Sequence, residues 1–170
     1  MSLRLSWQCP IVVSSTPIRD SEKLVTNKMA NTTPPKNLID STLRETLLQQ
    51  ARHALSHSYA PYSRFRVAAA VLTDAGEVFT GVNVENASYG LTNCAERSAI
   101  FTAVQQTKSP RLSLRAVAVV TADDVPCSPC GACRQVIFEF GENAVVIFKG
   151  QKGFQEMSIN DLLPESFRLF

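Results

Sequence analysis

The chain has 170 residues, a length typical of one domain that can bury its own hydrophobic core. Apolar residues make up 45% of it and charged residues 19%, as in ordinary soluble proteins, and no run of about 18 apolar residues predicts a membrane span. Residues 37–170 hold twelve basic and thirteen acidic residues, so this part is no polycation, which argues against a nucleic-acid substrate.

Residues 1–36 read as an N-terminal extension, because they are rich in Ser, Thr, Asn and Pro and carry five basic and two acidic residues. We expect a disordered tail, with Met29 as an alternative initiator and organelle targeting as the alternative role. The domain is expected to span residues 37–170. Five cysteines, three of them at metal-ligand spacing, favour a reducing compartment, and we expect the protein in the cytoplasm.

The domain is predicted to open with a helix, since apolar residues recur at helical spacing from Leu43 to Leu55. Asp40 or Ser41 can cap its N-terminus, and the segment Tyr59 to Ser63 ends it.

Two short strands are expected next, Phe65 to Leu72 and Glu77 to Val84, joined by a turn at Thr73 to Gly76. A loop from Asn83 to Asn93 then leads into a helix that starts near Cys94. This loop and helix start hold most of the polar residues discussed below.

The second half adds a continuous apolar strand, Arg115 to Thr121, as in a buried sheet interior. Pro129 is expected to open a helix that runs through Phe138, followed by a strand at Ala144 to Phe148 and a short edge strand at Phe154 to Met157. The order α-β-β-α-β-α-β-β predicts an α/β fold. We expect a three-layer α/β/α sandwich with a mixed sheet of about five strands.

A split cysteine signature carries the chemistry: Cys94, then Glu96, then Pro129-Cys130-Gly131-Ala132-Cys133, with 35 residues between Cys94 and Cys130. Three thiolates can hold one Zn²⁺ and leave its fourth position open for water. Both cysteine groups fall at predicted helix N-termini, where unpaired N–H groups and the helix dipole favour thiolates. The pattern is that of the zinc deaminases, in which the carboxylate serves as acid and base without binding the metal.

Three thiolates on Zn²⁺ leave an excess negative charge. Arg97 is the candidate for a hydrogen-bond donor to the sulfurs that offsets this charge. The alternative interpretation of Arg97 is an ordinary solvated helix residue. Cys127 forms another C-x2-C with Cys130, but it precedes the helix, so we interpret it as a small buried apolar residue. His53 and His57 are four apart on the first helix and are interpreted as solvated. Cys9 is expected to be free.

The chain closely resembles the small homotetrameric cytidine deaminases over about residues 38–167. The zinc signature and four further segments carry this resemblance: Ala60 to Phe65, Gly81 to Tyr89, Cys130 to Val136 and Leu162 to Phe167. It implies one zinc per subunit, a small nucleoside substrate, and a homotetramer with shared active sites. Neither a nucleic acid nor a membrane is expected as a partner.

The resemblance also assigns roles. Asn83 and Glu85 should hold the ribose hydroxyls, and an amide and a carboxylate two apart on extended chain do face the same way. Phe65 should pack against the pyrimidine ring, with an ordinary core phenylalanine as the alternative. Tyr89 and Phe167 should enter a neighbouring subunit's site. The remaining substrate-binding residues expected are Asn86 and Ala95, the latter through its backbone N–H, with the carbonyl of Cys127 or Pro129 opposite.

The predicted reaction is the hydrolytic deamination of cytidine and 2′-deoxycytidine, in pyrimidine salvage, with Glu96 moving the protons. Two other hypotheses stay open at this point. A related aminohydrolase of the blasticidin-S type would use the same zinc site on another substrate, and a structural zinc module would bind a partner. The carboxylate of Glu96 argues against the module, because a closed structural site has no use for it.

Overall fold

The computed structural model describes residues 39–107, 109 and 111–169. The expectations for residues 1–36, Cys9 and Met29 included, lie outside this range. In the described part the elements follow in this order: α1 (Ser41–Ala54), η1 (Leu55–His57), β1 (Val67–Thr73), β2 (Val78–Val82), η2 (Tyr89–Leu91), α2 (Ala95–Gln106), β3 (Leu114–Thr121), α3 (Gly131–Phe140), β4 (Val145–Gly150), β5 (Gly153–Ser158) and α4 (Ile159–Leu162). The predicted order is confirmed, and η1, η2 and α4 are additions.

The five strands form one sheet in the order β2-β1-β3-β4-β5. Strand β1 pairs antiparallel with both β2 and β3, while β3 and β4 are parallel and β4 and β5 antiparallel, so the sheet is mixed as predicted. All seven residues of β1 are buried, which fits a strand covered on both faces.

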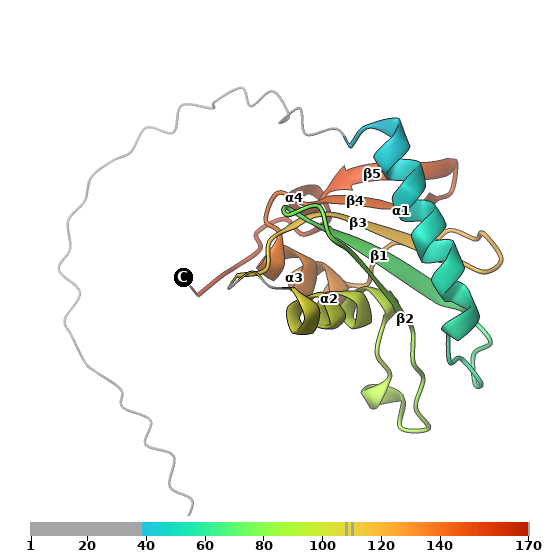
Figure 1. Ribbon diagram of the computed structural model, residues 1–170. Helices are drawn as coiled ribbons and strands as arrows, with labels where there is room; N and C mark the ends of the chain where they lie inside the picture. The colour runs from blue at the N-terminus through green and yellow to red at the C-terminus, as the bar shows by residue number, and fades with distance from the viewer. Residues whose placement is uncertain (1–38, 108, 110, 170) are drawn as a thin grey trace, which may run out of the picture. The chain divides into compact units, whose positions relative to one another are not determined.

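Helix α1 covers one face of the sheet (Figure 1). Its N-cap is Asp40, whose Oδ1 accepts a hydrogen bond from the backbone N–H of Leu43 at 2.8 Å. The buried side of the helix, Leu47, Leu48 and Ala51, packs on the even-numbered residues of β1 and β3. This alternation along the strands follows from the two-residue period of a β-strand.

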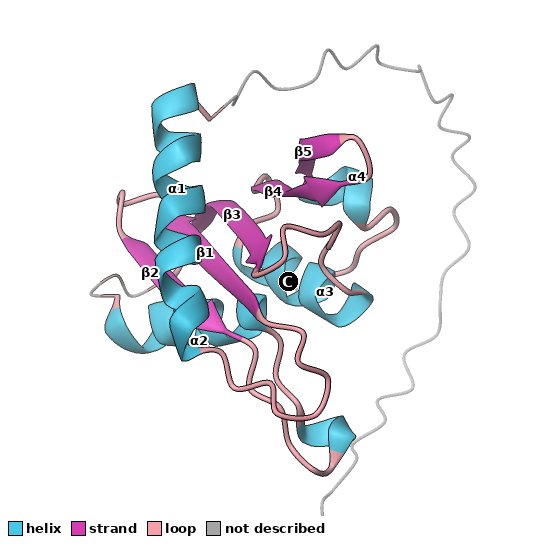
Figure 2. Ribbon diagram, turned by 90° about the vertical axis from the view of Figure 1, so that its right-hand side faces the viewer, coloured by secondary structure: helices cyan, strands magenta, loops and turns pink. Residues whose placement is uncertain are grey.

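Helices α2, α3 and α4 pack on the opposite face, against the odd-numbered residues of β1 and β3 (Figure 2). The molecule is therefore the three-layer α/β/α sandwich that the sequence predicts. Gly81 in β2 allows the closest approach, because a Cβ there would lie 2.1 Å from the backbone nitrogen of Ala99 in α2. The N-terminal part of α2 is thus held directly against the sheet.

Two predicted starts shift by two residues, and so do the ends of β2 and β4, which lie at Val82 and Gly150. Phe65 lies before β1, since the turn that precedes it ends at Arg64 with φ of 59° and delays the start of the strand. Pro129 lies outside α3, whose N-cap is Cys130. None of the helices in the described residues is long and apolar enough to cross a membrane.

Candidate metal centre and active site

Cys94, Cys130 and Cys133 converge where the N-termini of α2 and α3 meet: their three sulfur atoms all lie within 4.8 Å of one another. The Sγ atoms of Cys94 and Cys130 are 3.9 Å apart. Sulfur atoms bound to one tetrahedral Zn²⁺ at about 2.3 Å are separated by about 3.8 Å, so this spacing fits zinc. Cys133 is buried and Cys130 exposed, which leaves the cluster open on one side.

The helix starts explain why these thiols are available. Cys94 and Cys130 are the N-cap residues of α2 and α3, and neither side chain accepts a capping hydrogen bond. The sulfurs are therefore free to face the metal, while the first N–H groups and the dipole of each helix favour their anionic form. Cys133 follows one turn later on the same side of α3.

Arg97 lies against the cluster. Its guanidinium donates to Cys94 Sγ at 3.6 Å and to the Thr92 carbonyl oxygen at 3.3 Å. Hydrogen bonds from the Cys133 thiol and then from Arg97 lower the pKa of Cys94. The pKa of Cys133 is raised, because its thiol donates to the Cys94 sulfur. A bound cation replaces that shared proton, which is how metal binding releases protons.

Glu96 occupies the first turn of α2 and is only 5% exposed. Burial, and next the nearby Cys94 thiolate, raise the pKa of its carboxyl. A carboxylate with a raised pKa is a stronger proton acceptor than an ordinary glutamate, which suits an acid–base residue. Glu96 therefore lies beside the thiol cluster in surroundings that favour proton uptake.

Cys127 lies outside the thiol cluster, in line with its interpretation from sequence. It is partly buried and packs against the hydrophobic core on the α2–α3 side of the sheet. Desolvation raises the pKa of its thiol to about 11, so it is protonated at neutral pH. Among the described residues, His53 and His57 also belong to no group of three potential ligands.

A cavity of about 270 Å³ opens beside the thiol cluster. Thirteen residues line it: Ser63, Phe65, Val67, Asn83, Glu85, Thr92, Asn93, Cys94, Ala95, Glu96, Cys127, Ser128 and Cys130. They come from the segment before β1 and its first residue, the segment after β2, the start of α2 and the loop before α3. The cavity thus brings five predicted functional residues beside Cys94 and Cys130, although some of them are far apart in the sequence.

Asn83 is 9% exposed and anchors the cavity wall. Its Oδ1 accepts hydrogen bonds from Ser58 Oγ at 2.6 Å and from the Val67 backbone N–H at 2.9 Å, and its Nδ2 donates to the Phe65 carbonyl oxygen at 2.8 Å. One Nδ2 proton is left to face a ligand. The side chain thus holds the start of β1 as well as lining the cavity, a structural role that the sequence did not indicate.

Glu85 has its carboxylate fixed by the turn before β1. It accepts hydrogen bonds from the backbone N–H groups of Tyr62 and Ser63, at 2.8 and 3.2 Å, and from the Ser63 hydroxyl. The Ser63 hydroxyl is the largest cause that lowers the pKa of Glu85, so the carboxylate is ionised at neutral pH. An ionised, oriented carboxylate is a good acceptor for sugar hydroxyls.

Of four further predicted substrate residues, Phe65 and Tyr89 line cavities in this region, whereas Asn86 and Phe167 do not. Phe65 is partly exposed in the cavity, and Tyr89 lines a neighbouring cavity of about 330 Å³ that also contains Glu85. Asn86 is exposed, and its Oδ1 accepts from the backbone N–H of Ser88, which shapes the loop. Phe167 is 67% exposed and lines neither of these cavities.

Sequence reasoning missed the residues that support these groups. Arg134 donates to the Pro129 carbonyl oxygen and to the Leu162 carbonyl oxygen, both at 2.8 Å, and so fixes the loop before α3. Ser58 and Ser63 orient Asn83 and Glu85. Arg134 follows a metal ligand directly, which was the available signal, whereas the serines lie in a turn that carries no comparable pattern.

The family model "Cytidine and deoxycytidylate deaminase zinc-binding region" matches residues 41–149. A curated cytidine deaminase of Halalkalibacterium halodurans is 45% identical over 126 residues, which cover 73% of this chain and 93% of that protein. A cytidine deaminase of Mycobacterium tuberculosis is 44% identical over 119 residues, covering 70% and 85%.

Solved structures agree. The crystal structure of cytidine deaminase from Burkholderia pseudomallei superposes with a TM-score of 0.66 at 46% identity, covering 72% of this chain and 98% of that one. The structure of the enzyme from Mycobacterium tuberculosis gives a TM-score of 0.64 at 41% identity, covering 74% and 98%. Its three clustered thiols fit the zinc site that the family model names, and this chain belongs to the cytidine deaminase family.

Proposed function

We propose that this protein deaminates cytidine and 2′-deoxycytidine hydrolytically, giving uridine or 2′-deoxyuridine and ammonia. The observation that carries the proposal is the position of Glu96, buried beside the three thiols at the wall of a cavity that also presents Asn83 and Glu85. Family membership supports the same reaction. In this role the enzyme belongs to pyrimidine salvage.

Zinc bound by Cys94, Cys130 and Cys133, one per subunit, supplies a Lewis acid that makes water a nucleophile near neutral pH. Glu96 accepts the proton that the water loses as its oxygen attacks C4, and gives that proton to N3 of the ring. It then transfers the second proton of the water to the amino group, which leaves as ammonia. The two protons and the oxygen of water are thereby all accounted for.

The remaining residues hold the nucleoside. Asn83 donates a hydrogen bond from its free Nδ2 proton to a ribose hydroxyl, and the ionised Glu85 carboxylate accepts hydrogen bonds from the ribose hydroxyls. The pyrimidine ring packs against Phe65. The backbone N–H of Ala95 meets the base edge, and Asn86 shapes the loop next to the sugar. The low pKa of Glu85 supports its role as an ionised acceptor. The small mixed-polarity cavity suits a nucleoside better than a polymer.

The active unit that we infer is a homotetramer with shared sites. Tyr89, Leu91 and Phe167 are between 67% and 74% exposed, and large exposed apolar residues grouped on protruding segments commonly mark interfaces. Tyr89 and Phe167 would each complete a neighbouring copy's site. Sedimentation of the protein tests this assembly, and a fully active monomer would overturn it.

We place the enzyme in the cytoplasm, with residues 37–170 as the catalytic domain and residues 1–36 as an extension. The four cysteines of the described region are all free of disulfides, and free thiols at metal-ligand spacing favour a reducing compartment. Fractionation of cells that express the full chain checks this.

The reaction is tested by following the ultraviolet absorbance of cytidine and 2′-deoxycytidine, with and without a zinc chelator. We expect conversion that the chelator abolishes and added zinc restores. A panel that includes blasticidin S separates a nucleoside enzyme from a related aminohydrolase. Zinc binding without ammonia release from any of them would favour a structural module instead.

A further inference from the structure

The segment that follows α4 runs back along α3 and is tied to it at three points. Arg134 donates to the carbonyl oxygen of Leu162, the last residue of α4, at 2.8 Å, and the segment begins directly after it. Gln135 Nε2 donates to the Phe167 carbonyl oxygen at 3.2 Å. Arg168 makes the third attachment, one residue beyond Phe167. The helix that supplies two zinc ligands thus also holds the end of the described chain.

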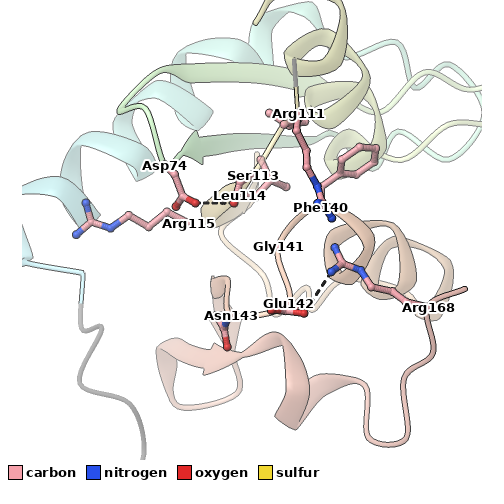
Figure 3. A pocket seen from close by; sticks show the side chains of 11 residues that line it. Asp74, Arg111, Ser113, Leu114, Arg115, Phe140, Gly141, Glu142, Asn143 and Arg168 are labelled. Carbon is pink, nitrogen blue, oxygen red and sulfur yellow. Dashed lines mark hydrogen bonds and ion pairs between the residues drawn. The ribbon is translucent and has the colours of Figure 1, made fainter. Parts of the chain in front are cut away.

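Arg168 binds the C-terminal end of α3 in three ways. Its guanidinium donates to the Glu139 carbonyl oxygen and, at 3.2 Å, to the Glu142 carboxylate, and it lies 5.6 Å from the centre of the Phe138 ring. Carbonyl groups in the last turn of a helix lack partners within the helix and carry the negative end of its dipole, so a cation is favoured there. Figure 3 shows Arg168 reaching Glu142 at the wall of a cavity of about 510 Å³.

The attachments next to Phe167 involve only its carbonyl group and the side chain of Arg168. Gln135 holds the carbonyl and the end of α3 holds Arg168, whereas Phe167 as a residue is 67% exposed. An exposed aromatic residue on a backbone fixed at this point is preorganised for a contact outside its own chain, because part of the ordering entropy has already been lost. The arrangement is therefore that of a presented side chain and not of a core residue.

We propose that Arg168 is a positioning residue: it clamps the C-terminal segment onto the end of α3 so that the Phe167 ring is presented to the nucleoside site of a neighbouring copy. This inference rests on the shared site of the proposed function. It adds a part of the machinery, Arg168 with Glu142 and the Glu139 carbonyl, that is remote from the thiol cluster and acts only through Phe167.

The test compares cytidine kinetics of Arg168→Ala, Phe167→Ala and the double variant. When the C-terminal segment is loosened, a smaller fraction of the sites is competent to bind substrate. Arg168→Ala should therefore raise KM roughly five-fold while kcat is unchanged. This size corresponds to the loss of one partly exposed ion pair and one hydrogen bond to a charged group. In the Phe167→Ala background, Arg168→Ala should cause no further rise, because its effect passes through the missing ring.

Three further readouts exclude a merely structural role. Arg168→Lys keeps the cation but not the planar fork that reaches both acceptors, so it should recover part of the loss. Raised ionic strength should increase KM of the unmodified enzyme and not of Arg168→Ala, since the pair with Glu142 is partly exposed. Arg115→Ala, at the wall of the same cavity but directed away from Arg168 (Figure 3), is the matched control and should behave like the unmodified enzyme.

Zinc content and melting temperature of Arg168→Ala should match those of the unmodified protein. If the single variant Arg168→Ala had an unchanged KM, or if the two effects were additive in the double variant, the positioning role of Arg168 would be wrong. The proposal of a shared site would not be affected by either result. An unchanged KM in Phe167→Ala would overturn the shared site itself, and the clamp with it.

Discussion

The thiol cluster and the rim of the cavity are built by different means. Cys94, Glu96 and Cys133 lie at the N-termini of two helices that pack on the sheet, and Glu96 and Cys133 are buried. At the rim, Tyr62 and Tyr89 contact each other edge to face, with ring centres 6.0 Å apart, yet Tyr62 is about half exposed and Tyr89 mostly exposed. In the arrangement that we propose, the thiol cluster and Glu96 come from one chain, whereas the exposed aromatic residues would be covered by a second copy.

The two regions differ in how precisely their side chains must be positioned. Metal ligands and a proton carrier must be held within fractions of an ångström, which rigid helix ends supported by the core provide. Aromatic groups that enclose a substrate can come from protruding loops if a neighbour orders them. Substitutions at the centre should therefore destroy the chemistry in each subunit, while substitutions at the rim should weaken binding and assembly.

The largest effect is expected when a predicted ligand is removed. Cys130→Ala should lose zinc and with it all measurable turnover, because two thiolates cannot hold the metal in a water-accessible site of the required geometry. Metal analysis and the ultraviolet assay measure both. The matched control is Cys127→Ala, three residues away and outside the cluster, which should keep one zinc per subunit. Loss of zinc in that control would show that the ligand set is wrong.

Next in size is the loss of the proton carrier. Glu96→Gln keeps the shape and burial of the side chain but cannot accept a proton, so turnover should fall by at least about 10²–10⁴-fold. Zinc content and sedimentation should be unchanged, since the carboxylate is not a ligand. A variant with near-normal turnover and bound zinc would contradict the assignment of Glu96.

The packing behind the centre gives a third prediction. A methyl group at Gly81 would collide with the backbone of α2 at Ala99, so Gly81→Ala should destabilise the fold by roughly 1–3 kcal/mol and displace the helix that carries Glu96. Denaturant unfolding and turnover should both report the change. Gly90→Ala is the control, because a Cβ there meets nothing within 4 Å. Equal stability of the two variants would mean that α2 is not rigidly seated.

A smaller effect is expected at the rim. Tyr89→Ala removes a ring that is 74% exposed in one chain, and it should raise KM about ten-fold with little change in kcat, equivalent to roughly 1.4 kcal/mol of binding. The tetramer should dissociate at a higher protein concentration. Tyr59→Ala, an exposed tyrosine that lines neither cavity beside the thiols, is the control. A Tyr89 variant with full affinity would mean that the rim works within one chain.

The smallest effect concerns Ser63, which lowers the pKa of Glu85. A carboxyl with a depressed pKa in the folded state contributes stability above its unfolded-state pKa of about 4.3, and this contribution is lost as the pH falls through the lower folded-state pKa. Ser63→Ala should therefore lower the melting temperature slightly near pH 7, and the difference should vanish in acid. Melting curves across this pH range test the sign. A difference that grows in acid would contradict the assigned hydrogen bond.

Local sequence patterns predicted the element order and the three cysteines that cluster in the structure. The helical spacing from Leu43, the apolar run ending at Thr121 and the cysteine pairs each depend on local periodicity or on residue type, which the chain carries explicitly. The three layers and the mixed sheet followed from that order of elements, whereas the strand order β2-β1-β3-β4-β5 came only from the structure. The starts of β1 and α3 shifted by about two residues, because the positive φ of Arg64 and the cap at Cys130 are backbone choices that propensity alone does not dictate.

The residues that hold the site's loops and side chains in place were found only in the folded structure. Asn83 holds the start of β1, Ser63 orients Glu85 and Arg134 fixes the loop before α3, all through contacts between residues distant in sequence or across a turn. The attachment of Arg168 to the end of α3 is of the same kind. Such contacts have no local signature, since they arise when chain segments are brought together by burial of the core, and only then do specific donors and acceptors become neighbours.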